Sequence, residues 1–220
     1  MKLKGFTMAE MLLMLGVLGI IAVLTMPALM NNILKQQVGP ALIKAMGVIG
    51  TADELLMQEH EIYSFRETCS EPEGGYVANC FEPYLKQRLG AAKDSTTVNY
   101  TKINDSNSIY LSTDSSEYSA YSTKNGVTYI FGPVNEAGDR QELYIDVNGL
   151  QKRPNAYGKD LFKTVLNFDD GRVYAFGSRI IKDSEETWEN GKCDNSGISD
   201  LDFCAGSVFD NAGKVIYPWS

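Results

Sequence analysis

Few side chains in this sequence could carry chemistry: one histidine, four cysteines and a small number of grouped carboxylates and lysines. Because His60 is the only histidine, zinc sites that need two or more histidines are excluded. A Ser-His-Asp triad would have to use His60, which falls at the polar end of a predicted helix. A solvated or capping histidine suits that place better than a catalytic one. No nucleophile–base pair is visible, so the sequence predicts that the chain is not an enzyme.

The four cysteines form two sequence pairs, each separated by eleven positions: Cys69 with Cys80, and Cys193 with Cys204. The C-x-x-C spacing of zinc and thiol-redox sites is absent. Four cysteines allow three disulfide connectivities, of which local pairing, Cys69–Cys80 and Cys193–Cys204, is the preferred prediction. On the chain-entropy model, closing each loop of about ten residues should stabilise the fold by about 2–3 kcal/mol.

An Asp-x-Asn-Gly sequence at residues 146–149 begins like a calcium-binding loop. An EF-hand loop needs Gly at its sixth position and Glu at its twelfth, and those positions hold Gln151 and Tyr157. The sequence is therefore no EF-hand, and a structural loop with an Asx turn is the preferred interpretation. No cofactor is predicted, and calcium is the one alternative. Its ligands would be Asp146, Asn148 and Asp160.

The main element that must position any of these groups is an uncharged run of twenty residues at positions 11–30. At about 1.5 Å of rise per residue, such a run is long enough to cross a bilayer core of roughly 30 Å as a helix. Lys2 and Lys4 precede it, so the N-terminus should stay cytoplasmic. Glu10 stands at the head of the run, where a carboxylate at mid-bilayer depth would cost about 2.5–3.5 kcal/mol and needs a reason.

Residues 5–10 read Gly-Phe-Thr-Met-Ala-Glu and lead directly into the uncharged run. This start resembles the prepilin signature of the type IV pilin and type II secretion pseudopilin family, over about thirty residues. The resemblance implies that a prepilin peptidase cuts after Gly5 and that the new N-terminus, Phe6, is methylated. It also implies that Glu10 pairs with the Phe6 α-amino group of a neighbouring subunit. Pro27 falls where the family commonly has a helix-kinking proline.

The resemblance and the periodicity together predict an α+β, pilin-like fold, in which one long N-terminal helix lies on an antiparallel sheet. The expected parts are a leader (1–5), a transmembrane and filament-core helix (6–30), an amphipathic helix (31–61) and an extracytoplasmic globular domain (62–220). Gly39-Pro40 should disturb the helix. Strands are expected at 108–112, 118–123, 127–131, 142–147 and 172–176, with an Asn125-Gly126 hairpin turn. The stripe of the amphipathic helix that should be buried is Ile33, Leu34, Val38, Leu42, Ala45, Met46, Ile49, Ala52, Leu55 and Leu56.

These expectations describe a structural filament subunit that is held in the inner membrane and then displayed outside the cell. Its partners would be other pilins, the prepilin peptidase, the assembly platform and, before assembly, lipid. The alternatives are a minor pilin that acts as an adhesin or takes up DNA, and a single-pass anchored binding domain that never polymerises. The net charge of −8 argues against nucleic acid as a partner. A short basic run, Lys152, Arg153, Lys159 and Lys163, is better interpreted as a solvated face than as a DNA contact.

Overall fold

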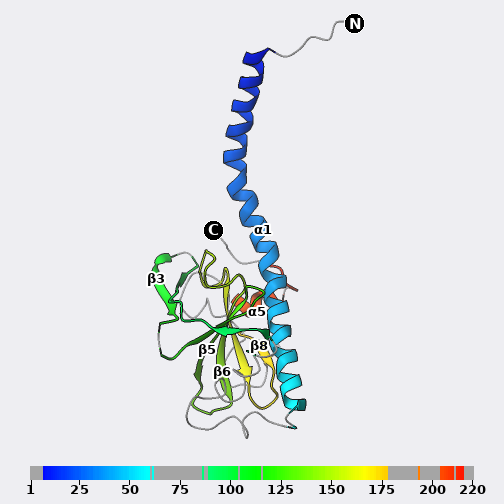
Figure 1. The fold of residues 1–220 in the computed structure, drawn as a ribbon, viewed down its shortest axis with the longest axis vertical. Helices are drawn as coiled ribbons and strands as arrows, with labels where there is room; N and C mark the ends of the chain where they lie inside the picture. The colour runs from blue at the N-terminus through cyan, green and yellow to red at the C-terminus, as the bar shows by residue number, and fades with distance from the viewer. Residues whose placement is uncertain are drawn as a thin grey trace.

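A single helix, α1 (Met8–Glu59), extends over 52 residues and dominates the shape of the protein. The structure is a computed structural model that describes residues 7–59, 61, 86, 89–103, 105–114, 116–177, 193, 204–210 and 212–215. Figure 1 shows that the first half of α1 projects beyond the globular part of the chain, whereas its second half lies along it. The predicted helix of residues 6–61 is therefore present within two residues at each end.

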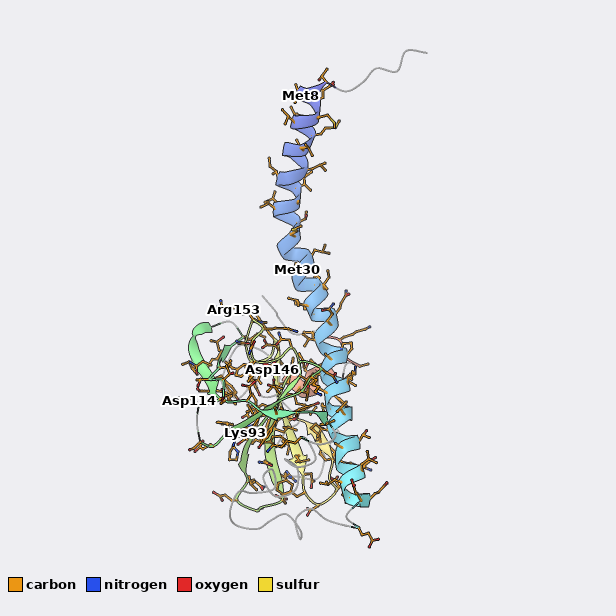
Figure 2. The ribbon with its side chains drawn as sticks, viewed as in Figure 1. Met8, Met30, Lys93, Asp114, Asp146 and Arg153 are labelled. Carbon is orange, nitrogen blue, oxygen red and sulfur yellow. A yellow bond between two sulfur atoms is a disulfide. The ribbon has the colours of Figure 1, made fainter. Side chains whose placement is uncertain are left out.

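The helix continues through both prolines that should disturb it. Residues 8–59 are helical without a break at Pro27 or at Gly39-Pro40, so the expected disturbance at Gly39-Pro40 does not end the helix. Its buried stripe is packed on the sheet, and such tertiary packing outweighs the loss of one backbone hydrogen bond. Figure 2 shows the helix axis changing direction just before Met30, close in sequence to Pro27.

The buried stripe of α1 is shorter than the sequence predicts. Seven of the ten stripe positions are buried, but Ile33, Leu34 and Leu55 are 39–48% exposed, so the prediction is wrong at these three. Ile33 and Leu34 precede the first buried position, where α1 has not yet reached the globular part of the chain. The buried seven are Val38, Leu42, Ala45, Met46, Ile49, Ala52 and Leu56.

An antiparallel sheet of six strands faces α1, in the order β1-β4-β5-β6-β7-β8. Tyr129 on this sheet donates a hydrogen bond to the Ala45 carbonyl of α1 at 3.2 Å, which marks the face of the sheet that α1 covers. Cys204–Asp210 forms the short helix α5, and β2 and β3 form a separate hairpin. The strands are β1 (Ala92–Lys93), β2 (Asn99–Lys102), β3 (Asp105–Ser112), β4 (Ser119–Ser122), β5 (Thr128–Val134), β6 (Arg140–Asp146), β7 (Leu161–Asn167) and β8 (Val173–Ala175).

The chain from β4 to β8 is a simple meander, as the recurring turn signals predict. All five expected strands are present, and Gly126 has the positive φ of 83° that the Asn125-Gly126 turn requires. The central strand β7 is absent from the prediction. Its residues 161–166 are all buried, so both of its faces are covered and the sequence lacks the period-two alternation that identifies a half-exposed strand.

A disulfide joins Cys193 to Cys204, the first residue of α5, which confirms one of the two predicted local pairs. Both cysteines are buried. Cys69, Cys80 and His60 lie outside the described residues, and so do Gly5 and Phe6 of the predicted processing site.

Candidate functional site

The part of α1 from Met8 to Met26 is predominantly apolar, and none of it is buried within the described chain. The segment Met8–Met26 is long and apolar enough to span a membrane. A helix that is apolar all round is buried in its functional setting, either by lipid or by other protein. This segment therefore needs a partner that the chain itself does not supply. Its large side chains, 49–84% exposed, include Met8, Leu12, Leu13, Leu15, Leu18, Ile20, Val23 and Leu24.

Glu10 and Thr7 close the start of this helix with reciprocal hydrogen bonds. The Thr7 backbone N–H and hydroxyl donate to Glu10 Oε2 at 2.8 and 2.9 Å, and the Glu10 backbone N–H donates to Thr7 Oγ1 at 3.3 Å. This is a capping box, which satisfies backbone donors at a helix start. Within the described part of the chain both bonds to the carboxylate use Oε2, so Oε1 keeps its acceptor capacity for another molecule. Thr7 has no role in the sequence prediction, although Thr-x-x-Glu ahead of an apolar run is a capping-box signature.

The predicted assembly residues Glu10 and Pro27 thus lie on one exposed helix, while the structure does not describe Phe6. A carboxylate in the first turn also interacts favourably with the positive end of the helix dipole. The cap gives Glu10 a role inside its own chain, and this role is separate from the charge pairing that the resemblance implies.

A second candidate site is the loop that joins β6 to β7, where two carboxylates are buried. Asp146 is 0% exposed and Asp160 is 1% exposed. Asp146 Oδ1 accepts hydrogen bonds from the backbone N–H groups of Asn148 and Gly149 at 3.0 and 2.7 Å. Its Oδ2 accepts one from the hydroxyl of Tyr100, on β2, at 2.5 Å. Asp146 thereby ties the loop and the β2–β3 hairpin to the end of β6.

Asp160 closes the other side of the same loop. Its Oδ2 accepts from the Asn155 backbone N–H at 2.7 Å and from the Asn148 side-chain amide at 3.3 Å. Its Oδ1 accepts from the Ala156 backbone N–H at 2.8 Å. Asp146, Asn148 and Asp160, the three ligands of the calcium alternative, lie around this one loop. Tyr100, which no local motif connects to them, is absent from the prediction.

The donors around these carboxylates argue for a structural loop rather than a calcium site. All four carboxylate oxygens of Asp146 and Asp160 accept N–H or O–H hydrogen bonds, and a cation would have to displace or share them. The side-chain oxygens of Asn148 and Asn155 are buried without a partner, which is the one feature that suits a cation. No group of three or more His, Cys, Asp or Glu side chains gathers among the described residues. Calcium binding stays a prediction, which a calorimetric titration would test.

The burial of this carboxylate pair predicts an unusual pH dependence of stability. Burial, together with the nearby charge of Asp146, raises the pKa of Asp160 to about 7, and burial also raises the pKa of Asp146. The folded chain therefore holds protons that the unfolded chain releases from about pH 4 upward. This contribution to stability is complete below the unfolded pKa and is lost as the pH rises through about 7. We expect a higher melting temperature near pH 5 than near pH 8.

Asp160→Asn tests this expectation. The variant should melt at a lower temperature, because an amide offers one acceptor oxygen where the carboxylate offers two, but its melting temperature should change less with pH. The measurement needs a chelator and a His60→Gln background, since histidine titrates in the same range. Asp169→Asn, which removes an exposed carboxylate, is the matched control and should keep the full pH dependence. An undiminished pH dependence in Asp160→Asn would contradict the assignment.

A third feature is a half-open cavity of about 340 Å³ at the opposite end of the sheet, beside the ion pair of Lys163 with Glu142. The Lys163 ammonium lies 2.7 Å from the Glu142 carboxylate and 4.7 Å from the centre of the Phe176 ring. Lys163 is buried on the face of the sheet that points away from α1. Tyr129 contacts α1, and its cross-strand partner Ile145 therefore lies on the same face. The next residue, Tyr144, and its partner Lys163 lie on the other face. The predicted basic run is thus divided: Lys163 lies in the sheet, whereas Lys152, Arg153 and Lys159 lie in the loop before it.

Comparison of the chain with protein-family models, with curated proteins and with solved structures finds no match.

Proposed function

We propose that this chain is a structural subunit of a type IV pilus or type II secretion filament. It is held in the inner membrane by α1 with its N-terminus in the cytoplasm. It is cut after Gly5, methylated at Phe6, and assembled with other subunits through the first half of α1. Its partners are other pilins, the prepilin peptidase and the assembly platform, and the chain itself carries out no catalysis.

The observation that carries this proposal is the exposed apolar half of α1, continuous with a second half that packs on the sheet. One rigid helix joins the two, so the apolar half can pass from lipid into a bundle of identical helices without any refolding of the globular part. Both environments bury the apolar surface, and each buried methylene contributes about 0.8 kcal/mol.

The start of the helix supports the same proposal. A capped helix that begins at Met8 places Glu10 in its first turn, one turn from the residue that cleavage would turn into a free amine. In an apolar filament core, a carboxylate and an amine pair only in one axial register, since any other register leaves a charge unpaired. The α+β arrangement of one long helix on an antiparallel sheet also suits a pilin-like fold.

Recovery of filaments tests the proposal. In cells with an active prepilin peptidase and assembly system, shearing the cell surface should release the mature chain as part of a fibre. A chain that stays entirely in the membrane fraction, while the host's other pilins are released, would instead favour a single-pass anchored domain.

A further inference from the structure

Two groups of charged residues lie at opposite ends of the sheet. Thr128, Asp146 and Leu161 lie side by side at one end of β5, β6 and β7. The turn after β4 and the loop after β6 leave from this end, and they carry Lys124, Lys152, Arg153 and Lys159. We call this the basic end. The turns at the opposite end carry four carboxylates and two arginines: Glu136, Asp139, Asp169, Asp170, Arg140 and Arg172.

The basic end is the end from which the exposed half of α1 emerges. Figure 2 shows Arg153 at this end, nearer to Met30 than Asp146 or Lys93. Partial burial lowers the pKa of Lys159 against the opposing charge of Asp160, and the charge of Lys35 on α1 lowers it further, so Lys35 lies on the side of α1 that faces this loop.

Two further cations on the α1 side complete this surface. Lys35 lies one helical turn before Gly39, whose backbone contacts Gly213. Lys214 directly follows Gly213, so it lies beside the same turn of α1, and its side chain is exposed. The basic end thus presents six cations on the side of the globular part from which the helix projects: Lys35, Lys124, Lys152, Arg153, Lys159 and Lys214.

The spacing along α1 places this surface at the level of lipid headgroups. No charged residue occurs between Glu10 and Lys35, a stretch of 24 residues. As a helix this stretch is about 36 Å long, compared with a hydrocarbon core of about 30 Å and a full bilayer of about 40–45 Å. With the uncharged stretch in the membrane, Lys35 lies in the headgroup layer, and the basic end faces that layer because the projecting half of α1 emerges from this end (Figure 2).

We propose that the basic end binds the anionic lipid headgroups of the membrane that α1 spans, and so holds the globular part upright against that membrane before assembly. This inference rests on the membrane stage of the proposed function. It does not depend on which side of the membrane the globular part occupies.

Among the described residues, three carboxylates near the basic end are shielded by burial or by hydrogen bonds, and a fourth, Asp105, lies opposite Lys102 in the β2–β3 hairpin. Asp146 and Asp160 are buried, and their oxygens are occupied by donors of the loop and by Tyr100. Asp94 is half-buried and accepts hydrogen bonds from Ser122 and Thr96. Each exposed cation close to an anionic membrane surface strengthens binding to that membrane on the order of fivefold. Salt screens this attraction. The same attraction would draw the basic end to DNA or to the acidic end of a second copy, and both are outcomes of the test.

Amine footprinting of the full chain in vesicles tests the proposal. The chain is reconstituted through α1 into phosphatidylcholine vesicles, with or without about a third of phosphatidylglycerol. Its lysines are then acylated by a water-soluble reagent and quantified by mass spectrometry. Acylation of Lys152 and Lys214 should slow about fivefold or more in the anionic vesicles, relative to the exposed Lys44 further along α1 in the same molecules, and recover at high salt.

Charge reversals supply the matched control. Lys152→Glu with Arg153→Glu should largely remove the protection of Lys124 and Lys214. Arg140→Glu with Arg172→Glu makes the same change in net charge at the opposite end of the sheet and should leave the protection of Lys152 and Lys214 unchanged.

Three results would overturn the proposal. Equal acylation in both kinds of vesicle would exclude a lipid contact. Protection of the lysines that increases with the number of chains per vesicle, and not with the fraction of anionic lipid, would assign the surface to a second copy of the chain. Protection by added duplex DNA alone would assign it to DNA. None of these affects filament recovery, whereas a chain that alkaline washing removes from the vesicles would refute the membrane span on which both proposals rest.

Discussion

Glu10→Gln is expected to abolish incorporation of the chain into filaments, even though it leaves the helix cap in place. Glutamine at this position of a capping box still accepts the two Thr7 hydrogen bonds, so the start of α1 should be unchanged. What the variant loses is the negative charge. If that charge pairs with the Phe6 amine of a neighbouring subunit, its removal leaves a buried amine unpaired. Such a loss costs about 3–5 kcal/mol, which is more than a hundredfold in an association constant.

Thr7→Val is the matched control, because it removes the hydroxyl of the cap and keeps the charge. The loss should cost about 1 kcal/mol of helix stability and leave filament recovery close to that of the unaltered chain. The two variants are compared by the amount of chain in sheared surface filaments, normalised to the amount in membranes. A loss in Thr7→Val as large as that in Glu10→Gln would mean that assembly depends on the helix start itself and would not assign the effect to the charge. No loss in Glu10→Gln would contradict the pairing.

Gly39→Ala is expected to destabilise the globular part more than the same change at any other glycine of α1. A Cβ at Gly39 would lie 1.7 Å from the Gly213 carbonyl oxygen, which no side-chain adjustment can relieve. Gly213 is itself held at a positive φ of 83° and donates a hydrogen bond to the Val208 carbonyl at 2.9 Å. Either α1 must move off the C-terminal turn or the turn must unfold. We expect a loss of about 3 kcal/mol in the free energy of unfolding, measured by denaturant titration in micelles.

Gly47→Ala provides the comparison on the same helix. A Cβ at Gly47 meets no atom within 4 Å, and alanine is the better helix former by about 0.8–1.0 kcal/mol. The control should therefore be neutral or slightly stabilising. A Gly39→Ala chain as stable as Gly47→Ala would show that α1 and the C-terminal turn are not in contact.

Sequence patterns predict the parts of this fold that depend on neighbours along the chain. The length of α1 follows from its unbroken apolar and amphipathic pattern, and the β4–β5 hairpin follows from Asn125-Gly126. Strand β7 is not predicted, because both of its faces are buried and its sequence therefore does not alternate between apolar and polar residues. Ile33 and Leu34 are misassigned because an apolar residue has the same sequence signal whether its own domain or another molecule covers it.

Contacts between distant segments are the part that no local pattern contains. The Asp-x-Asn-Gly motif identifies the β6–β7 loop, but the Tyr100 hydroxyl that completes it comes from 46 residues upstream. The approach of Gly39 to Gly213 likewise joins residues that lie 174 positions apart in the sequence. The run from Lys152 to Lys163 appears as one basic patch in the sequence, yet the turn into β7 buries Lys163 beside Glu142.

The mass of the N-terminal peptide, from chain isolated out of its native membrane, tests the central claim most directly. Filament-type processing predicts a peptide that begins at Phe6, carries one added methyl group and lacks the first five residues. A peptide that begins at Met1, in cells whose prepilin peptidase processes other substrates, would contradict the claim and leave α1 as a plain membrane anchor.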